Sequence, residues 1–181
     1  MIDILDRRRL LDEAVCLGIL TARRVKPLSR LEYPPEPQVL DILAALGLVT
    51  AFVIRYAQNG AQVSHTILSH DPSLIRQYTL EFDRTVIEGE TPAVVRVEAG
   101  YFGYPACCAE AYISRPYSPN GLSGRDRALL FHYACPGCRE TPALLPLYRS
   151  AWNEARHILK YPDGWTSALT STPPRDIMPP S

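Results

Sequence analysis

Four of the five cysteines in this 181-residue sequence occur in two tight pairs. The first is the adjacent pair Cys107-Cys108, and the second is Cys135 with Cys138 in a Cys-x-x-Cys motif. His132 stands three residues before that motif. Thiolate and imidazole groups bind zinc, and a Cys-x-x-Cys turn lets two sulfurs reach one ion. The sequence therefore predicts a metal site formed by Cys107, Cys108, His132, Cys135 and Cys138.

The residues around the two pairs suit such a site. Proline presets φ and glycine allows a positive φ, so Pro136-Gly137 favours the tight turn that the motif needs. Both pairs also lie close to the predicted N-terminal ends of helices, where free N–H groups and the helix dipole stabilise thiolates. Three nearby arginines could offset the charge of several thiolates: Arg125, Arg127 and Arg139.

The adjacent pair leaves the identity of the metal open. Neighbouring residues on a helix point about 100° apart, so Cys107 and Cys108 suit a tetrahedral zinc site less well than a second Cys-x-x-Cys would. An iron–sulfur cluster accepts neighbouring cysteines more easily because it contains several metal atoms. In a third arrangement, His132 joins three of the cysteines and the fourth thiol is free. Zinc is the leading prediction, since it is the commoner partner of isolated Cys-x-x-Cys pairs, and an iron–sulfur cluster is the alternative.

Two functions without a metal also fit the cysteines. A thiol-dependent enzyme would use Cys135/Cys138 or Cys107/Cys108 as a redox dithiol, or one cysteine as a nucleophile. A binding module without catalysis would use the same pairs as structural disulfides. The apolar run before Cys135 is similar to the start of a thioredoxin, but too little patterned sequence follows to complete that fold.

The first pair lies in a distinctive segment, Phe-Gly-Tyr-Pro-Ala-Cys-Cys-Ala-Glu-Ala-Tyr, over residues 102–112. Together with His132-x-x-Cys135-x-x-Cys138, this segment resembles an archaeal family of conserved proteins of unknown function, whose hallmark is Gly-Tyr-Pro-x-Cys-Cys followed by a histidine and a cysteine pair. The family's later cysteines are spaced more widely. The resemblance implies an archaeal, cytosolic origin and a shared Cys/His site, with no established activity to carry over.

Hydrophobic periodicity predicts the elements of the N-terminal half. Apolar residues at helical spacing predict helices over 3–25 and from Val39 to Gly47. The β-rich residues 48–57 and the Asn59-Gly60 turn predict a hairpin whose second strand ends near Ser69. A two-residue turn would pair Tyr56, Ile54 and Phe52 with Val63, His65 and Ile67.

Further along the chain, Asp71-Pro72 predicts the start of a helix, and residues 92–99 predict a third strand. Pro105 suits the first position of a helix that carries Cys107-Cys108. Ser123 is expected to cap a short helix running to His132, and the last helix is predicted over 143–160.

These elements predict the α+β fold class. We expect a small antiparallel sheet of about three strands covered by helices, with a helical C-terminal half that carries the cysteines. One domain is expected over 1–161, and the proline-rich residues 162–181 are expected to form a loose tail.

Several other candidate residues have simple structural explanations. His65 is expected to be a core histidine, Glu110 a solvated helix residue and Asp71 a helix cap. Aromatic packing accounts for Tyr101, Phe102 and Tyr104. Cys16 is expected to be buried in the first helix.

The composition limits the partners and the compartment. Lys plus Arg and Asp plus Glu each number 19, so the formal net charge is zero and nucleic acid is not indicated, although a local basic patch remains possible. No apolar run of about 18 residues predicts a membrane span, and the N-terminus lacks the apolar core of a secretory signal. We therefore expect a cytoplasmic protein with reduced thiols.

Overall fold

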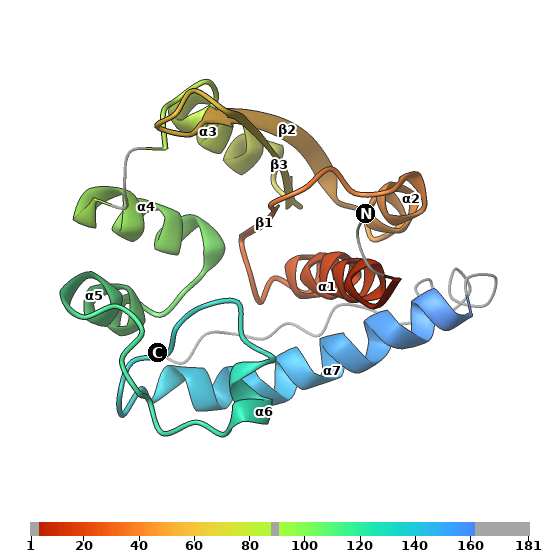
Figure 1. The fold of residues 1–181 in the computed structure, drawn as a ribbon. Helices are drawn as coiled ribbons and strands as arrows, with labels where there is room; N and C mark the ends of the chain where they lie inside the picture. Colours follow the sequence, from red (N-terminus) through yellow and green to blue (C-terminus); the bar gives the residue numbers. More distant parts are fainter. Residues whose placement is uncertain (1–3, 88–90, 162–181) are drawn as a thin grey trace.

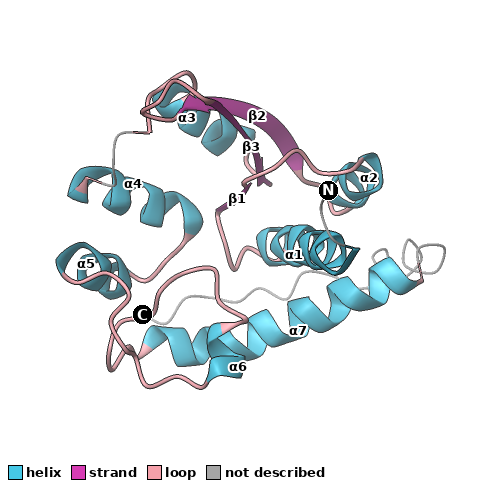
Figure 2. Ribbon diagram, in the orientation of Figure 1, coloured by secondary structure: helices cyan, strands magenta, loops and turns pink. Residues whose placement is uncertain are grey.

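An antiparallel sheet of three strands organises the N-terminal part of the protein, seen in a computed structural model that describes residues 4–87 and 91–161 (Figure 1). The strands are β1 (Leu28–Leu31), β2 (Val49–Tyr56) and β3 (Gln62–Ser69), in the order β1-β3-β2. Helices account for most of the remaining described residues (Figure 2). The predicted α+β class with a small antiparallel sheet is confirmed.

Seven helices occur in the described ranges. They are α1 (Ile4–Ala22), α2 (Pro37–Ala45), α3 (Pro72–Phe82), α4 (Pro92–Phe102), α5 (Ala106–Ser114), α6 (Gly124–Arg127) and α7 (Glu140–Lys160). The four from α4 to α7 form the helical C-terminal half that the sequence predicts. Residues 162–181, predicted as a tail, lie outside the described residues.

Both faces of the sheet are covered, because its strands are apolar on each side. Leu31 and Leu68 point to the side packed by α1 and α2. Val53 and Ile67 point to the other side, where they meet α3 and the end of α4. Helix α7 packs on the opposite side of α1 through an apolar stripe that includes Tyr148 and Trp152, so α1 is buried between the sheet and α7.

The hairpin has a different register from the predicted one. Val53 lies opposite His65 and Tyr56 opposite Gln62, one residue away from the expected pairing. The cause is the turn: the Gly60 N–H donates to the Ala57 carbonyl, and Gly60 has a φ of +79°. A glycine in this left-handed conformation adds a bulge residue to the loop, and one extra residue shifts every cross-strand pair by one.

The predicted strand over 92–99 is wrong, since these residues lie in α4. Thr91 caps this helix by accepting a hydrogen bond from the Val94 N–H, and Pro92 occupies its first turn. Gly103 ends it with a φ of +64°. These end signals outweigh the β-branched composition of the segment. The third strand is instead β1, whose four residues pair with β3 along an edge of the sheet.

Two helices of the C-terminal half, α6 and α7, begin or end at other residues than predicted. Ser123 caps α6 as expected, but the helix stops at Arg127 rather than continuing to His132. Helix α7 begins at Glu140, three residues before the predicted start. The segment that bears His132, Cys135 and Cys138 is therefore an irregular loop between two helices.

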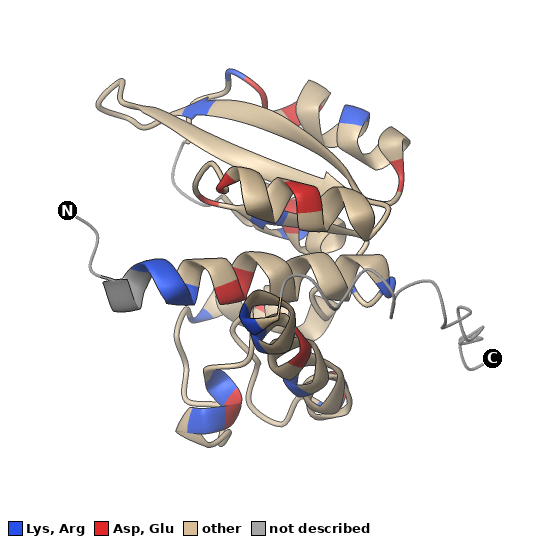
Figure 3. Cartoon of the chain, turned by 90° about the vertical axis from the view of Figure 1, so that its right-hand side faces the viewer, with Lys and Arg blue, Asp and Glu red and all other residues tan. Residues whose placement is uncertain are grey.

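Charge is spread over the whole molecule. Basic and acidic segments are interspersed in Figure 3, without a division into a positive and a negative face. Among the helices of the described ranges, none combines the length and the apolar character needed to cross a bilayer.

Candidate metal centre

The first cysteine pair lies in the first turn of α5. Pro105 precedes this helix, and its carbonyl accepts a hydrogen bond from the Cys108 N–H over 2.9 Å. Cys108 is 2% exposed, whereas Cys107 faces solvent. Despite the angle between neighbouring helical residues, both thiols reach the same partner: the Cys138 sulfur lies 3.7 Å from the Cys107 sulfur and 3.5 Å from the Cys108 sulfur.

The second pair forms the expected tight turn just before α7. The Cys138 N–H donates to the Cys135 carbonyl over 3.2 Å, and Gly137 has a φ of +68°, which glycine adopts without a steric penalty. Two further N–H groups point at sulfur. The Cys135 N–H donates to the Cys108 sulfur, and the Thr141 N–H in the first turn of α7 donates to the Cys138 sulfur, both over 3.3 Å.

The turn and α5 bring the four sulfurs of Cys107, Cys108, Cys135 and Cys138 together, with all of them within 4.8 Å of one another. Zinc bonds to sulfur at about 2.3 Å, so four tetrahedral sulfur ligands of one ion lie about 3.8 Å apart. The observed separations therefore match a single tetrahedral ion. In a 4Fe–4S cluster each cysteine binds a different iron atom, which spreads the sulfurs more widely, whereas in a 2Fe–2S cluster two cysteines bind each iron.

None of the sulfurs is bonded to another. All five cysteines are free, and the two Sγ–Sγ distances to Cys138, 3.5 and 3.7 Å, far exceed the length of a disulfide bond, about 2.05 Å. The alternative of two structural disulfides does not describe this structure.

The thiols differ in acidity. Desolvation, together with the neighbouring sulfurs, raises the pKa of Cys107 to about 12. Desolvation also raises the pKa of Cys108 to about 11. At Cys138 desolvation acts in the same direction, but hydrogen bonds from the Thr141 hydroxyl and N–H and from the Cys108 and Cys107 thiols outweigh it and lower the pKa to about 7. The metal-free site therefore favours a thiolate at Cys138, and binding of a cation would release protons from Cys107 and Cys108.

His132 lies behind the four thiols rather than among them. Its Nε2 atom is 3.0 Å from the Thr141 hydroxyl, which in turn lies 3.2 Å from the Cys138 sulfur. The ring packs on Tyr104 with a centroid distance of 5.3 Å, and its Nδ1 atom is buried without a hydrogen-bond partner in the described part of the chain. Burial, with a contribution from the charge of Lys26, lowers its pKa to about 4, so the imidazole is neutral at pH 7.

Two residues of this centre were missed by sequence reasoning. Thr141 is fully buried and contacts the sulfurs of both Cys108 and Cys138. Its position three residues after Cys138, at the start of a helix, is the signal that could have pointed to it. Lys26, 2% exposed, donates from Nζ to the Phe102 carbonyl over 2.6 Å and lies 4.4 Å from the centre of the Tyr104 ring. No sequence pattern marks it.

The secondary candidates have structural roles. Cys16 is fully buried in α1, and Asp71 caps α3, both as predicted. Glu110 forms an exposed ion pair with Arg96. His65 is 5% exposed as a core residue, although its Nδ1 has no hydrogen-bond partner among the described residues. The three aromatic candidates pack against their neighbours: Tyr101, Phe102 and Tyr104.

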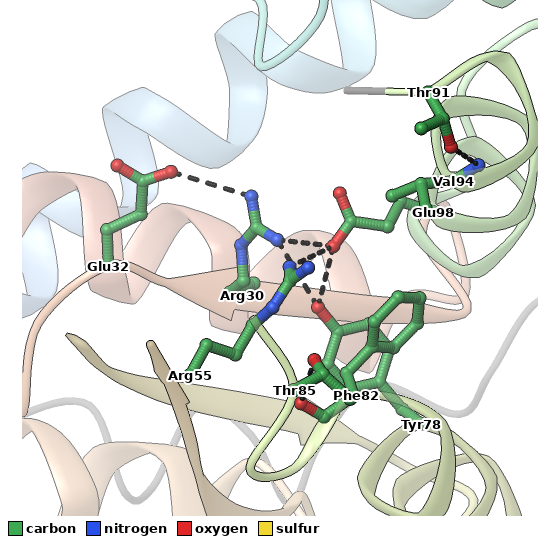
Figure 4. Close-up of polar contacts among 9 residues, drawn as sticks. All are labelled: Arg30, Glu32, Arg55, Tyr78, Phe82, Thr85, Thr91, Val94 and Glu98. Carbon is green, nitrogen blue, oxygen red and sulfur yellow. Dashed lines mark hydrogen bonds and ion pairs between the residues drawn. The ribbon is translucent and has the colours of Figure 1, made fainter. Parts of the chain in front are cut away.

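A buried polar network fastens α4, and through it α5, to the sheet (Figure 4). One carboxylate oxygen of Glu98 accepts hydrogen bonds from Arg30 over 2.7 Å, from Arg55 over 3.1 Å and from the Tyr78 hydroxyl over 3.1 Å. These donors come from β1, β2 and α3, so one side chain of α4 links three other elements. No sequence pattern singled out these charged residues, and the packing of α4 on the sheet brings them together.

The fold and its sulfur cluster define an α+β protein with four cysteines placed to hold a metal ion. Comparison of the chain with protein-family models, with curated proteins and with solved structures found no match. The resemblance to an archaeal family therefore stays a prediction.

Proposed function

We propose that the protein is a zinc protein in which Cys107, Cys108, Cys135 and Cys138 hold one ion with a structural role. The observation that carries this proposal is the convergence of the four sulfurs from two separate segments to within 4.8 Å. Four protein ligands complete the coordination of zinc, whereas catalytic zinc sites keep a position open for water or substrate. A closed sphere of four thiolates therefore supports a structural ion.

The segment between α5 and α7 is held to the core mainly by Leu129, Leu130 and Phe131, which pack against α1 and α7. Within residues 115–139, Ala134 is the single buried residue, and the four-residue α6 is the single helix. Outside residues 129–131 the segment buries little apolar surface, so the turn that carries Cys135 and Cys138 gains little free energy from packing. A metal that ties Cys135 and Cys138 to α5 would supply that stability, as structural zinc does in other small modules.

Thr141 supports the proposal from outside the thiols. Residues that hydrogen-bond to metal ligands orient them and stabilise the deprotonated form. Thr141 contacts two of the four sulfurs, and His132 holds its hydroxyl from the other side.

Metal analysis of the purified protein tests the proposal. We expect one zinc and no iron per chain, with zinc lost in Cys135→Ser and Cys108→Ser but retained in the matched control Cys16→Ser, which removes a buried thiol outside the cluster. Several irons with a brown absorption band would show a cluster instead. A single iron, or no metal at all, would also contradict the zinc assignment.

One observation favours a second function, a thiol-dependent enzyme. The pKa of Cys138 is lowered to about 7, and the Cys108 thiol lies 3.5 Å from its sulfur, an arrangement suited to a reactive dithiol. Protein purified with free thiols and no metal, in which one thiol reacts rapidly with iodoacetamide at pH 7 and Cys138→Ser abolishes that reaction, would support this function.

A further inference from the structure

A surface next to the cysteines carries two exposed aromatic rings. Tyr117 is 65% exposed and Tyr133 is 56% exposed, and their rings meet edge to face with centroids 4.7 Å apart. The Tyr112 ring packs beside both, stacked on Tyr133 at 5.7 Å and edge to face with Tyr117 at 5.6 Å, so the three form an aromatic cluster. Exposed aromatic residues beside polar ones mark binding surfaces. We call the surface formed by Tyr117, Tyr133 and the depressions beside them the tyrosine surface.

The Tyr133 side chain lines two depressions of the surface. The larger has a volume of about 320 Å³ and is lined by Asn120, Arg127, Leu130, Phe131, His132 and Tyr133. The smaller one has a volume of about 10 Å³ and includes Tyr133 together with Tyr117, Arg115 and Cys135. Each depression thus combines an aromatic ring with a guanidinium group, and the two share the Tyr133 side chain.

The tyrosine surface is basic even though the chain is neutral overall. The charged residues that line the two depressions are Arg115 and Arg127, and no acidic residue lines either one. Within residues 4–87 and 91–161 neither arginine forms an ion pair, so both guanidinium groups are available to a ligand.

The backbone at Tyr117 is strained. Its φ is +58°, in the left-handed region that bulky residues rarely adopt. Such conformations persist where the surrounding structure imposes them, and they gather at ligand-binding sites. At Tyr117 this backbone carries an aromatic ring that lies outside the core, beside Tyr133.

We propose that the tyrosine surface binds single-stranded nucleic acid, with unpaired bases stacked on Tyr117 and Tyr133 and phosphates held by Arg115 and Arg127. Aromatic side chains that alternate with basic groups along a groove are the usual means of binding single strands, because every base has a face for stacking. The Asn120 side-chain oxygen accepts from the Leu122 N–H over 3.0 Å, which leaves its amide N–H₂ free to donate to a base edge in the larger depression. In a duplex the faces of the bases are exposed for stacking only at the two ends. The tyrosine rings are therefore expected to select unpaired strands.

This inference goes beyond the zinc site, since neither tyrosine nor any of the arginines is a ligand. The link between the two is positional. Tyr133 stands two residues before Cys135, so a metal bound as proposed above would tie down the loop that presents the ring.

Fluorescence anisotropy with the full chain and labelled oligothymidylate and oligouridylate of about 15 nucleotides, near the upper site size of one binding fold, tests the proposal. We expect micromolar affinity at low salt that falls with rising salt, and much weaker binding of a duplex. Arg115→Glu and Arg127→Glu should each weaken binding at least about tenfold and reduce the salt slope by about 0.7 for each phosphate that the protein no longer neutralises. The matched control is Arg76→Glu, the same change at an exposed arginine on α3.

Stacking is tested separately from charge. Tyr133→Ala and Tyr117→Ala should each weaken binding about tenfold, because each removes the ring on which one base stacks, while Tyr133→Phe keeps the ring and retains binding. Phe52→Ala, which removes another exposed aromatic ring on β2, should have no effect.

Zinc content is measured on every sample, so that loss of the metal site and loss of nucleic-acid binding are separate results. A wild-type protein that ignores the single strands would overturn the proposal. Equal affinity for the single strand and the duplex would also overturn it, as would thymidine monophosphate that binds as tightly as the oligonucleotide. So would an Arg76→Glu variant that weakens binding as much as Arg127→Glu does.

Discussion

The Thr141 hydroxyl lies 3.2 Å from the Cys138 sulfur, and the N–H of the same threonine donates to that sulfur over 3.3 Å. One residue at the start of α7 thus supplies two hydrogen bonds to a single thiol. Removing the hydroxyl in Thr141→Val leaves the backbone donor in place, so the sulfur keeps only one of these two hydrogen bonds. Because such outer partners stabilise metal ligands, we expect zinc affinity to fall about 10- to 100-fold in a chelator competition titration.

Thr141→Ser is the matched control for this change. It keeps the hydroxyl that touches the Cys108 and Cys138 sulfurs and removes only a methyl group, so zinc affinity should stay near the wild-type value. Equal affinities for the valine and serine variants would show that the hydroxyl does not support the site.

The network around Glu98 predicts a large loss of stability. Its carboxylate is 18% exposed and meets two guanidinium groups (Figure 4), so Glu98→Gln leaves Arg30 and Arg55 without their shared counter-ion. Removing one partner of a buried ion pair costs about 3 kcal/mol. Urea unfolding should show this decrease in the free energy of unfolding.

Glu110→Gln provides the exposed comparison. The ion pair of Glu110 with Arg96 is about half exposed at both ends, and such surface pairs contribute less than about 1 kcal/mol. A loss in Glu98→Gln no larger than that in Glu110→Gln would mean that the network does not hold α4 to the sheet.

The buried side chain of Lys26 should make the free energy of unfolding depend on pH. Burial lowers its pKa in the folded protein to about 7, from an ordinary value of 10.5. Between these two values the unfolded chain binds more protons than the folded protein, so stability rises with pH, by up to about 1.4 kcal/mol for each pH unit. Below about pH 7 both states carry the charge, and the full cost of burying it is present.

Lys26→Met isolates this effect, because Cys138 in metal-free protein changes stability in the same direction over an overlapping range. The variant should be more stable than wild type at pH 6, with the difference shrinking steadily toward pH 10. Thermal melts of zinc-loaded protein across this range provide the measurement, and parallel profiles for the two proteins would contradict the prediction.

The candidate centre was predictable from sequence because cysteine is rare and its spacing carries chemistry. Cys135 and Cys138 form a tight turn that Pro136-Gly137 favours, and α5 begins after Pro105 as a helix. What could not be predicted was the layer behind the thiols. The position of Thr141 three residues after Cys138 is a weak signal, because a threonine at a helix start usually serves as a cap rather than as a partner of sulfur.

The larger error, at residues 92–99, had a physical cause. Pro-Ala-Val-Val-Arg-Val is rich in β-branched residues, and β-propensity is a weak guide when helix-capping residues stand at both ends. Placing this segment in a strand also hid the role of Glu98. Only a helix lying on the sheet brings that carboxylate to the arginines of β1 and β2.

Gly103, at the turn between α4 and α5, predicts a coupling between the fold and the metal centre. Its φ is +64°, and a Cβ atom at this position would lie 2.7 Å from the Pro27 side chain. Gly60 also has a positive φ, +79°, but a Cβ there meets no atom within 4 Å. Gly60→Ala should therefore show only the cost of the left-handed backbone, about 1 kcal/mol.

Gly103→Ala adds a steric clash to that cost, for a total loss of about 3 kcal/mol. Relief of the clash requires the turn to move away from Pro27, and the turn carries Pro105 and the start of α5. The sulfurs of Cys107 and Cys108 would then shift relative to Cys138, so zinc affinity should fall in Gly103→Ala and stay unchanged in Gly60→Ala. Equal stability losses in the two variants, or equal zinc affinities, would show that α5 is positioned independently of the contact between Gly103 and Pro27.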